Sequence, residues 1–307
     1  MRYDCRTVQG QVVPLQAPVS VKLHAHEDAP ADDLSVVFPV LDAVPKIATV
    51  RVYHDGLAVF SGIVDEQITQ VDRNGAWLKL VARSRAALLL DNEALPQQYV
   101  NPSLTTLFKR HVAPYGFCGF LGNPAPFDTR LTVTKGMSQW QVIEEFCIRC
   151  FNFTPVVTPD DWLDCSGDNP KELIIFDNVN PNGVKYSSLT HRDKFYKRIS
   201  RLYLQPKSGR PYTSVLDDKA AQRMGVVRCR FVVSNNFRGK RMLKAAKRRA
   251  EEFLVGCSGG ICARLRMPAV VQDAVLGTVL KLSVAGWNYS LDAGGEWCEY
   301  ILRKEEI

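Results

Sequence analysis

Short segments in which apolar and polar residues alternate, separated by turn sequences, dominate the first 95 residues of the chain. Residues 19–24 and 49–53 both alternate with a period of two, which predicts antiparallel strands with one buried face. Asp55 and Gly56 follow the second segment, and an Asp-Gly pair favours the positive φ angles of a type I′ hairpin turn. A further turn over residues 72–75 is expected before the next strand. Such a meander buries its apolar face only by closing on itself or by packing on a second sheet, so we expect a small barrel or a sandwich.

The middle of the chain, residues 96–185, changes to a helical pattern. Residues 83–90 give a first helical candidate, and two prolines interrupt the pattern after it. Ser103 predicts the start of a second helix, and Ser138 with Gln141 has the spacing of a capping box that opens a third. The sequence therefore predicts a small mixed α/β insert after the first group of strands.

The rest of the insert is expected to contain an acidic, mobile loop over residues 158–171 and a strand over residues 173–176. Strands then return, interrupted by one helix over about residues 239–254. The expected strands are residues 198–204, 226–233, 265–267, 279–284 and 297–303. A turn over residues 292–295 would join the last two as a hairpin. We predict an α+β fold that is predominantly antiparallel β.

The distribution of charge supports a division into modules. Residues 1–100 hold 9 Lys and Arg against 12 Asp and Glu, and residues 101–185 hold 7 against 9. Residues 186–307 hold 23 against 11, so the positive charge of the chain is concentrated there. We predict domains at residues 1–95, 96–185 and 186–307.

The composition excludes some classes of protein. The sequence has no run of 18 apolar residues and no apolar signal core at its start, so we expect neither a membrane-spanning segment nor export by a signal peptide. Nine scattered cysteines fit a reducing compartment. Cys147 and Cys150 form a C-x-x-C pair near the end of a helical pattern, where the helix dipole would not activate a thiol. Core packing explains these cysteines best, with a zinc site or a redox pair as alternatives.

The sequence contains no recognised catalytic motif. Residues 256–260 are superficially similar to the sequence around a serine-protease nucleophile, but Cys257 replaces the Asp of that motif. We expect a flexible connection there, with Gly256 as the C-cap of the preceding helix. His24 and His26 share one side of a strand and could form half of a metal site, but exposed polar residues at a strand end explain them better. We expect no enzyme activity, no cofactor and no metal.

A cluster of basic residues is the clearest electrostatic feature. Seven Lys and Arg lie within twelve residues, 238–249, without an acidic residue. On a helix Lys240, Lys244, Lys247 and Arg248 would share one face. This face could be solvated, could contact an acidic protein, or could bind phosphates without sequence specificity.

Two phrases of the sequence carry a family resemblance. Residues 59–65 end in Gly62-Ile63-Val64-Asp65, and residues 82–91 read A-R-S-R-A-A-L-L-L-D. Further phrases follow in order over residues 102–117, 136–143, 245–254, 267–268, 276–279 and 300–303. Together they resemble the baseplate hub proteins of contractile-tailed phages and related injection machines, the group that includes the phage Mu hub and late control protein D. The resemblance covers about residues 40–307, and the loop over 158–171 departs from it. We expect no appended lytic domain, so the resemblance does not imply cell-wall cleavage.

The resemblance implies a homotrimer in which each subunit supplies two tube-like β-barrel domains flanking the insert. Six barrels would form a pseudo-sixfold ring that adapts a hexameric tail tube to a trimeric spike protein. The further partners implied are the tape-measure protein and the baseplate wedge proteins, with DNA only as passing cargo. The implied location is the baseplate of a virion tail, after assembly in the cytoplasm of a bacterial host.

The predicted function is therefore a non-enzymatic structural hub. The interface candidates are the hairpin tip at Asp55 and Gly56 and the basic face of Lys240, Lys244, Lys247 and Arg248. Two alternatives stay open at this point. One is a nucleic-acid-binding accessory protein that uses the basic C-terminal module, and the other is a tail-associated hydrolase that uses Cys257 or Ser258.

Overall fold

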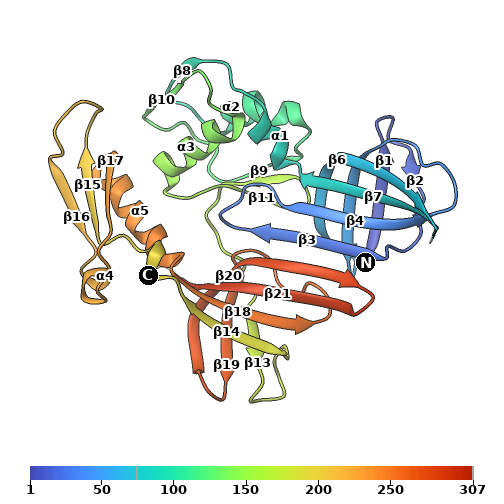
Figure 1. Cartoon of the computed structure of the whole chain (residues 1–307). Helices are drawn as coiled ribbons and strands as arrows, with labels where there is room; N and C mark the ends of the chain where they lie inside the picture. Colours follow the sequence, from blue (N-terminus) through green and yellow to red (C-terminus); the bar gives the residue numbers. More distant parts are fainter. Residues whose placement is uncertain (74, 306–307) are drawn as a thin grey trace. The chain divides into compact units, whose positions relative to one another are not determined.

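The computed structural model describes residues 1–73 and 75–305, which form two compact units. Unit 1 comprises Met1–Asn169, Ser258–Cys262 and Gly286–Cys298, and unit 2 comprises the rest of the chain. Most of the strands pair antiparallel, and a few short helices accompany them (Figure 1). The predicted α+β class with predominantly antiparallel strands is confirmed. The division into three domains stays a prediction.

The main sheet of unit 1 is built from the alternating segments at the start of the chain. Its strands are β1 Arg2–Thr7, β2 Val12–Val13, β3 Ser20–His26, β4 Asp33–Val40, β5 Ile47–His54, β6 Leu57–Asp72 and β7 Gly75–Ser84, in the order β3-β4-β7-β6-β5-β1-β2. The last part of β20, which spans Gly277–Asp292, pairs with β3. Alternate residues are buried in β3 (Val21, Leu23 and Ala25) and in β4 (Leu34, Val36 and Phe38), as the period of two requires. The predicted turn over residues 72–75 includes residue 74, which lies outside the described residues.

The described strands do not close into barrels. Their order runs as an open path from β14 to β2, so the two tube-like barrels expected for residues 1–95 and 186–307 are open sheets. Alternation along a strand specifies which face of the sheet is buried, but it carries no information on whether the two edge strands meet. The expectation of closure is therefore wrong for the part of the chain that the structure describes.

The insert follows β7 and completes unit 1. Its helices are α1 Ala86–Asp91, α2 Leu104–His111, the 3₁₀ helix η1 Ala113–Tyr115 and α3 Gln139–Phe151; its strands are β8 Gln97–Val100, β9 Gly119–Leu121, β10 Arg130–Val133, β11 Val156–Val157 and β12 Trp162–Asp164. Both predicted caps are confirmed: the Ser103 hydroxyl accepts from the Thr106 amide, and Ser138 and Gln141 form the capping box. The apolar faces of these helices pack into one core, which includes Phe146 of α3 and Leu163 of β12.

Two expectations for the insert are corrected. The helix expected over residues 83–90 begins only at Ala86, because residues 83 and 84 are the last of β7 and pair with β6. The segment over residues 158–171 is not a loop throughout, because β12 lies within it and pairs with β9 and β11. The acidic composition of this segment predicted an exposed loop, but the carboxylate of Asp161 within it is buried.

Unit 2 contains two sheets. The larger contains β13 Ile174–Asp177, β14 Ser188–Asp193, β18 Glu251–Ser258, β19 Pro268–Asp273, the first part of β20 and β21 Gly295–Lys304, which runs on from unit 1. The smaller contains β15 Arg201–Gln205, β16 Ser214–Asp217 and β17 Cys229–Val233, and the helix α5 Asn236–Arg248 packs against it. The short helices η2 Phe195–Lys197 and α4 Lys219–Arg223 join these strands. The predicted strand over residues 173–176 and the turn over 292–295 are confirmed.

Several boundaries in unit 2 differ from the sequence expectation. Helix α5 ends at Arg248, so Phe253 and Leu254 lie on strand β18, which pairs with β14. Gly256 and Cys257 also belong to β18 rather than to a flexible connection. Residues 265–267 form no strand, and β19 begins at Pro268. A short apolar run fits helix and strand periodicity alike, so the pairing partner decides which one forms.

Gly62 lies at a position of β6 where the sheet has no room for a side chain. A Cβ at this position would lie 2.2 Å from the carbonyl oxygen of Arg83 and 2.6 Å from the Phe60 ring. Because the oxygen belongs to the backbone of β7, it cannot move aside without disturbing the sheet. We expect Gly62→Ala to lower the free energy of unfolding by about 1–3 kcal/mol.

Urea unfolding monitored by tryptophan fluorescence measures this loss. The matched control is Gly294→Ala, whose nearest neighbour is the flexible carboxylate of Asp292 at 3.1 Å. Equal unfolding midpoints for the two variants would contradict the assigned role of Gly62.

Candidate functional site

Residues 59–65 and residues 82–91 meet at the end of β7. Arg83 forms ion pairs with Asp65 on β6 and with Asp91 at the end of α1, each at 2.7 Å. Hydrogen bonds from Arg83 lower the pKa of Asp91 below its usual value, so the carboxylate stays charged. Arg83 therefore binds the aspartates at the ends of both segments, Asp65 and Asp91, and these contacts fix helix α1 against the sheet.

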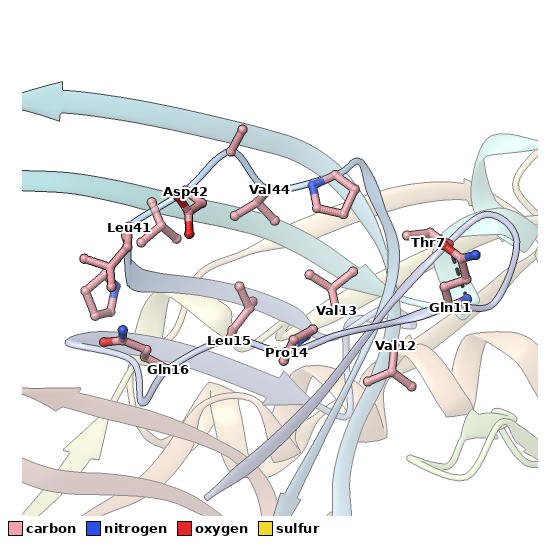
Figure 2. Close-up of a pocket in the computed structure, with 14 residues that line it drawn as sticks. Thr7, Gln11, Val12, Val13, Pro14, Leu15, Gln16, Leu41, Asp42 and Val44 are labelled. Atoms are coloured by element: carbon pink, nitrogen blue, oxygen red, sulfur yellow. Dashed lines mark hydrogen bonds between the residues drawn. The ribbon is translucent and has the colours of Figure 1, made fainter.

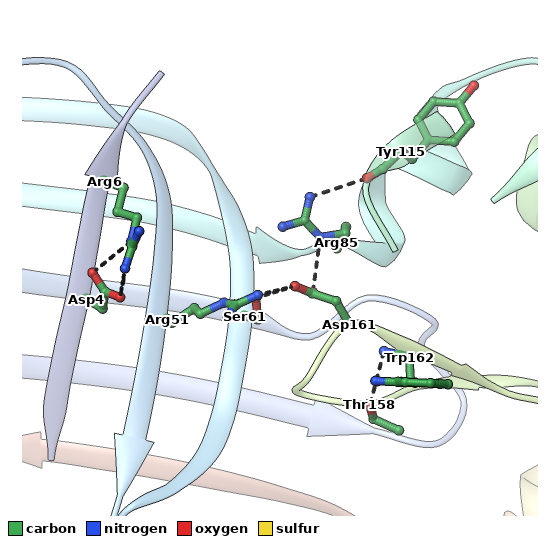
Figure 3. Close-up of polar contacts among 9 residues, drawn as sticks. All are labelled: Asp4, Arg6, Arg51, Ser61, Arg85, Tyr115, Thr158, Asp161 and Trp162. Carbon is green, nitrogen blue, oxygen red and sulfur yellow. Dashed lines mark hydrogen bonds and ion pairs between the residues drawn. The ribbon is translucent and has the colours of Figure 1, made fainter. Parts of the chain in front are cut away.

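A second arginine of the same phrase binds a buried carboxylate. Asp161 is 1% exposed, and its carboxylate lies 3.1 Å from Arg85 Nε and 2.9 Å from Arg51 Nη2 (Figure 3). Ser61 Oγ donates to the same carboxylate at 2.9 Å, and Arg85 Nη1 donates to the Tyr115 carbonyl at 3.3 Å. Arg85 Nε and Asp161 Oδ1 are close enough to attract each other as charges, although they do not form a well-aligned hydrogen bond.

We call this cluster the arginine junction; its members are Arg51, Ser61, Arg85 and Asp161. Its members come from β5, β6, the β7–α1 connection and the turn before β12. The junction therefore fixes the insert to the sheet inside unit 1. Sequence reasoning missed it because Asp161 lies 110 residues from Arg51 and 100 from Ser61. No local pattern in the sequence marks a carboxylate whose partners are so distant.

The predicted hairpin tip has the expected backbone. Asp55 and Gly56 have φ angles of 48° and 82°, both in the left-handed region that a type I′ turn requires. The Asp55 side chain is 90% exposed and lies 3.5 Å from His54 Nδ1. The tip is thus an exposed turn between β5 and β6, and its role as an interface stays a prediction.

The basic face is divided by the structure. Lys240, Lys244 and Lys247 are exposed on α5. Arg248 instead donates to the Lys304 carbonyl at 3.1 Å and to Ser283 Oγ at 3.0 Å. The three lysines therefore remain as interface candidates, while Arg248 attaches the end of the helix to β20 and β21.

A shallow groove of about 350 Å³ lies in unit 1 beside β2 (Figure 2). It is lined by Thr7, residues 11–16 and residues 39–45, and its lining is mostly apolar. The side chain of Asp42 is the one carboxylate among them. A single carboxylate without a base, a nucleophile or a metal ligand beside it does not form a catalytic site.

The other candidates for chemistry are occupied by structural contacts. His24 Nδ1 lies 2.8 Å from Asn288 Oδ1, and His26 Nδ1 accepts from the Asp28 amide. Over the described residues, no group of three or more His, Cys, Asp or Glu could hold a metal ion. Cys257 is buried in β18, and burial raises the pKa of Cys150, which leaves that thiol less reactive.

All nine cysteines lie within the described residues, and none of them is joined in a disulfide. Five are buried, namely Cys5, Cys147, Cys165, Cys257 and Cys298. No helix in the part of the chain that the structure describes is long and apolar enough to cross a membrane.

The fold of the chain is similar to that of solved tail proteins. Over 99% of the chain it is similar to the crystal structure of a tail protein from Neisseria meningitidis, with a TM-score of 0.78, 18% identity and 96% of that chain covered. It is also similar to the 43 kDa tail protein of prophage MuSo2 from Shewanella oneidensis, with a TM-score of 0.76 and 15% identity over 99% of this chain and 98% of that one.

A third similar structure comes from a secretion machine. The Escherichia coli protein c3393 is described as a component of the type VI secretion system with structural similarity to the T4 tail proteins gp27 and gp5. The similarity has a TM-score of 0.60 and 10% identity over 100% of this chain and 77% of that one. No protein-family model and no curated protein matches the sequence. The resemblance predicted from the ordered phrases is confirmed at the level of the fold.

Proposed function

We propose that this protein is the structural baseplate hub of a phage-like contractile tail, a homotrimer that joins the hexameric tail tube to the trimeric spike. The observation that carries the proposal is the similarity of the whole chain to two phage tail proteins, each covered over almost its entire length. A shared fold over both units implies that the same two-unit subunit is used, rather than one domain borrowed for another purpose.

The division of charge between the units supports a ring. Unit 1 contains 14 Lys and Arg against 21 Asp and Glu, whereas unit 2 contains 25 against 11. Two copies of unit 2 repel each other, but unit 2 of one copy attracts unit 1 of the next. Such a head-to-tail contact is heterologous, and a heterologous contact repeated with threefold rotation closes a ring.

The remaining partners follow from the same proposal. The ring would contact the tail tube, the spike, the tape-measure protein and the baseplate wedge proteins, and would allow DNA to pass. It would act in the baseplate of the virion tail after assembly in the bacterial cytoplasm. No catalytic role is part of the proposal, and the similarity to two tail proteins favours a structural one.

The mass of the purified protein in solution tests the proposal. We expect a species of three chains of 34.4 kDa each, and an electron-microscopy outline with threefold symmetry and a central hole. A monomer at every concentration, both alone and mixed with tube and spike proteins, would contradict the proposed hub.

The basic face of α5 is proposed to contact a partner in this assembly. Replacing Lys240, Lys244 and Lys247 by Glu changes the charge by six units without touching Arg248. We expect tube–hub–spike assembly to weaken at least tenfold, because the reversed charges repel an acidic partner surface. Light scattering of reconstituted mixtures measures this loss.

The matched control replaces the same three lysines by Arg, which keeps the charge and should assemble normally. The far-ultraviolet circular dichroism of both variants should equal that of the unmodified protein, because the three side chains are exposed. Assembly that is unchanged after charge reversal would remove this helix from the interface.

A second candidate function, nucleic-acid binding by the basic module, is favoured by the excess of 14 positive charges in unit 2. It predicts retention of DNA on filters that falls steeply as salt rises. A hub through which DNA only passes should retain DNA weakly, so strong retention at about 0.15 M salt would favour this alternative.

A further inference from the structure

The small sheet of unit 2 has one covered and one open face. Parallel pairing of β15 with β17 places Leu202 and Leu204 opposite Arg230 and Val232, on the side where α5 packs. A Cβ on Gly239 would lie only 2.8 Å from Leu204 Cδ1, which shows how closely α5 approaches this side. Because side chains alternate along a strand, the intervening residues point to the opposite face.

That opposite face carries a row of exposed apolar side chains, called here the aromatic face. Tyr203 pairs with Val215 on β16 and with Phe231 on β17, so the three lie side by side across the sheet. The aromatic face also includes Tyr212 and Val233. Phe231 is 61% exposed, and Val215 and Val233 are 48% and 57% exposed.

The aromatic rings are already arranged before any partner binds. The rings of Tyr203 and Phe231 stack at 4.7 Å with an interplanar angle of 8°, and Tyr212 meets Phe231 edge-on at 5.3 Å. Clusters of exposed aromatic residues of this kind are typical of the centre of protein interfaces, where they lose little conformational entropy on binding. The stack itself covers one side of the Tyr203 ring and one side of the Phe231 ring, which suits a base-stacking platform less well.

The segment that contains the aromatic face is strongly basic. Residues 198–249 contain fifteen Lys and Arg but only two acidic residues, Asp217 and Asp218. Asp217 forms an ion pair with Arg201 at 2.7 Å, and Asp218 caps α4 by accepting from the Ala220 and Ala221 amides. Both carboxylates are therefore used locally, and the segment presents a net positive charge to a partner.

We propose that the aromatic face binds unit 1 of a second copy of this chain. Two aromatic faces would not pair with each other, because residues 198–249 carry a net charge of +13 in each copy and the two segments repel. Unit 1 carries a net charge of −7 and is a complementary surface present at equal concentration. The inference rests on the proposed ring of subunits and identifies one side of its subunit contact.

Cross-linking of the unmodified protein is the first test. Copies labelled with ¹⁵N and unlabelled copies are mixed, dissociated and reassembled, and treated with a carbodiimide that joins lysines to carboxylates. We expect mixed-isotope links from Lys207 or Lys219, near the aromatic face, to Asp or Glu of unit 1. If the mixed-isotope links join unit 1 only to parts of unit 2 away from the aromatic face, the inference is wrong, although the proposed ring is not contradicted.

Substitution of the aromatic face is the second test. Phe231→Ser with Val215→Ser should raise the concentration at which the oligomer dissociates by about tenfold or more, measured by analytical ultracentrifugation. The control is Val275→Ser, which changes a valine that is 90% exposed in the β19–β20 turn and outside this sheet. Circular dichroism and the thermal midpoint show whether the variant is folded.

The outcomes separate the inference from the proposed function. An unmodified protein that is monomeric contradicts the ring and the inference together. A trimer whose stability is unchanged in the folded double variant contradicts the inference alone. If the variant keeps its trimer but loses retention of DNA on filters, the aromatic face binds nucleic acid rather than a second copy.

Discussion

Replacing Asp161 with alanine is expected to lower the free energy of unfolding of unit 1 by about 3–5 kcal/mol. Its carboxylate is 1% exposed and holds the guanidinium groups of Arg51 and Arg85. Without it, Arg85, whose side chain is only 17% exposed, loses the anion that compensates its charge. The loss should exceed that of Gly62→Ala, because it leaves a charge without its partner rather than one crowded contact.

Tryptophan fluorescence during urea unfolding measures this effect selectively, since all five tryptophans lie in unit 1. The control is Asp160→Ala, which removes an exposed carboxylate one residue earlier and should change the unfolding free energy by less than about 0.5 kcal/mol. If both variants unfold at the same urea concentration as the unmodified protein, the arginine junction contributes nothing to stability.

Glu252 is expected to have an effect of similar size in unit 2. It is 4% exposed and accepts from Arg303 at 2.7 Å and from Lys194. Burial alone would raise the pKa of Glu252, but the hydrogen bonds from Lys194 and Arg303 outweigh burial and lower it. We expect Glu252→Gln to cost about 3–5 kcal/mol, because Arg303 is itself buried and would lose its anion.

The lowered pKa of Glu252 also fixes the direction of the pH dependence. In the unfolded chain this carboxyl titrates near its ordinary value of 4.5, and in the folded chain it titrates lower. The folded state is therefore favoured above pH 4.5, and this contribution is lost as the pH falls through the folded pKa. The Glu252→Gln variant should lack this part of the acid destabilisation.

Hydrogen exchange of the β18 amides reports on unit 2, which has no tryptophan in its sequence. The control is Glu251→Gln, whose side chain is more exposed and pairs with Lys304 at 2.8 Å and His191 at 3.3 Å. We expect it to cost less than about 1 kcal/mol. An acid sensitivity of β18 that persists unchanged in Glu252→Gln would assign the pH dependence to other groups.

The elements whose signals are local could be predicted well. The hairpin turn at Asp55 and Gly56, the caps at Ser103 and Ser138 and the strand over residues 173–176 each depend on residues within a few positions of one another. The end of α5 could not be predicted, because residues 250–254 suit a helix as well as a strand and pairing of β18 with β14 decides between them. We expected closed barrels where the sheets are open for a related reason: no feature of the sequence indicates whether the two edge strands of a sheet meet.

The candidate site could be predicted only in part. The sequence by itself determined that the C-terminal part of the chain is basic and that Lys240, Lys244 and Lys247 lie on one helix. It also contained, in order, the segments that carry the family resemblance, such as residues 82–91. Only the tertiary structure decided that Arg83 and Arg85 of that phrase bind different carboxylates, that Arg248 is a structural contact, and that Tyr203 and Phe231 form an exposed stack. The physical reason is that charge and periodicity are properties of neighbouring residues, whereas burial and pairing depend on residues brought together from distant parts of the chain.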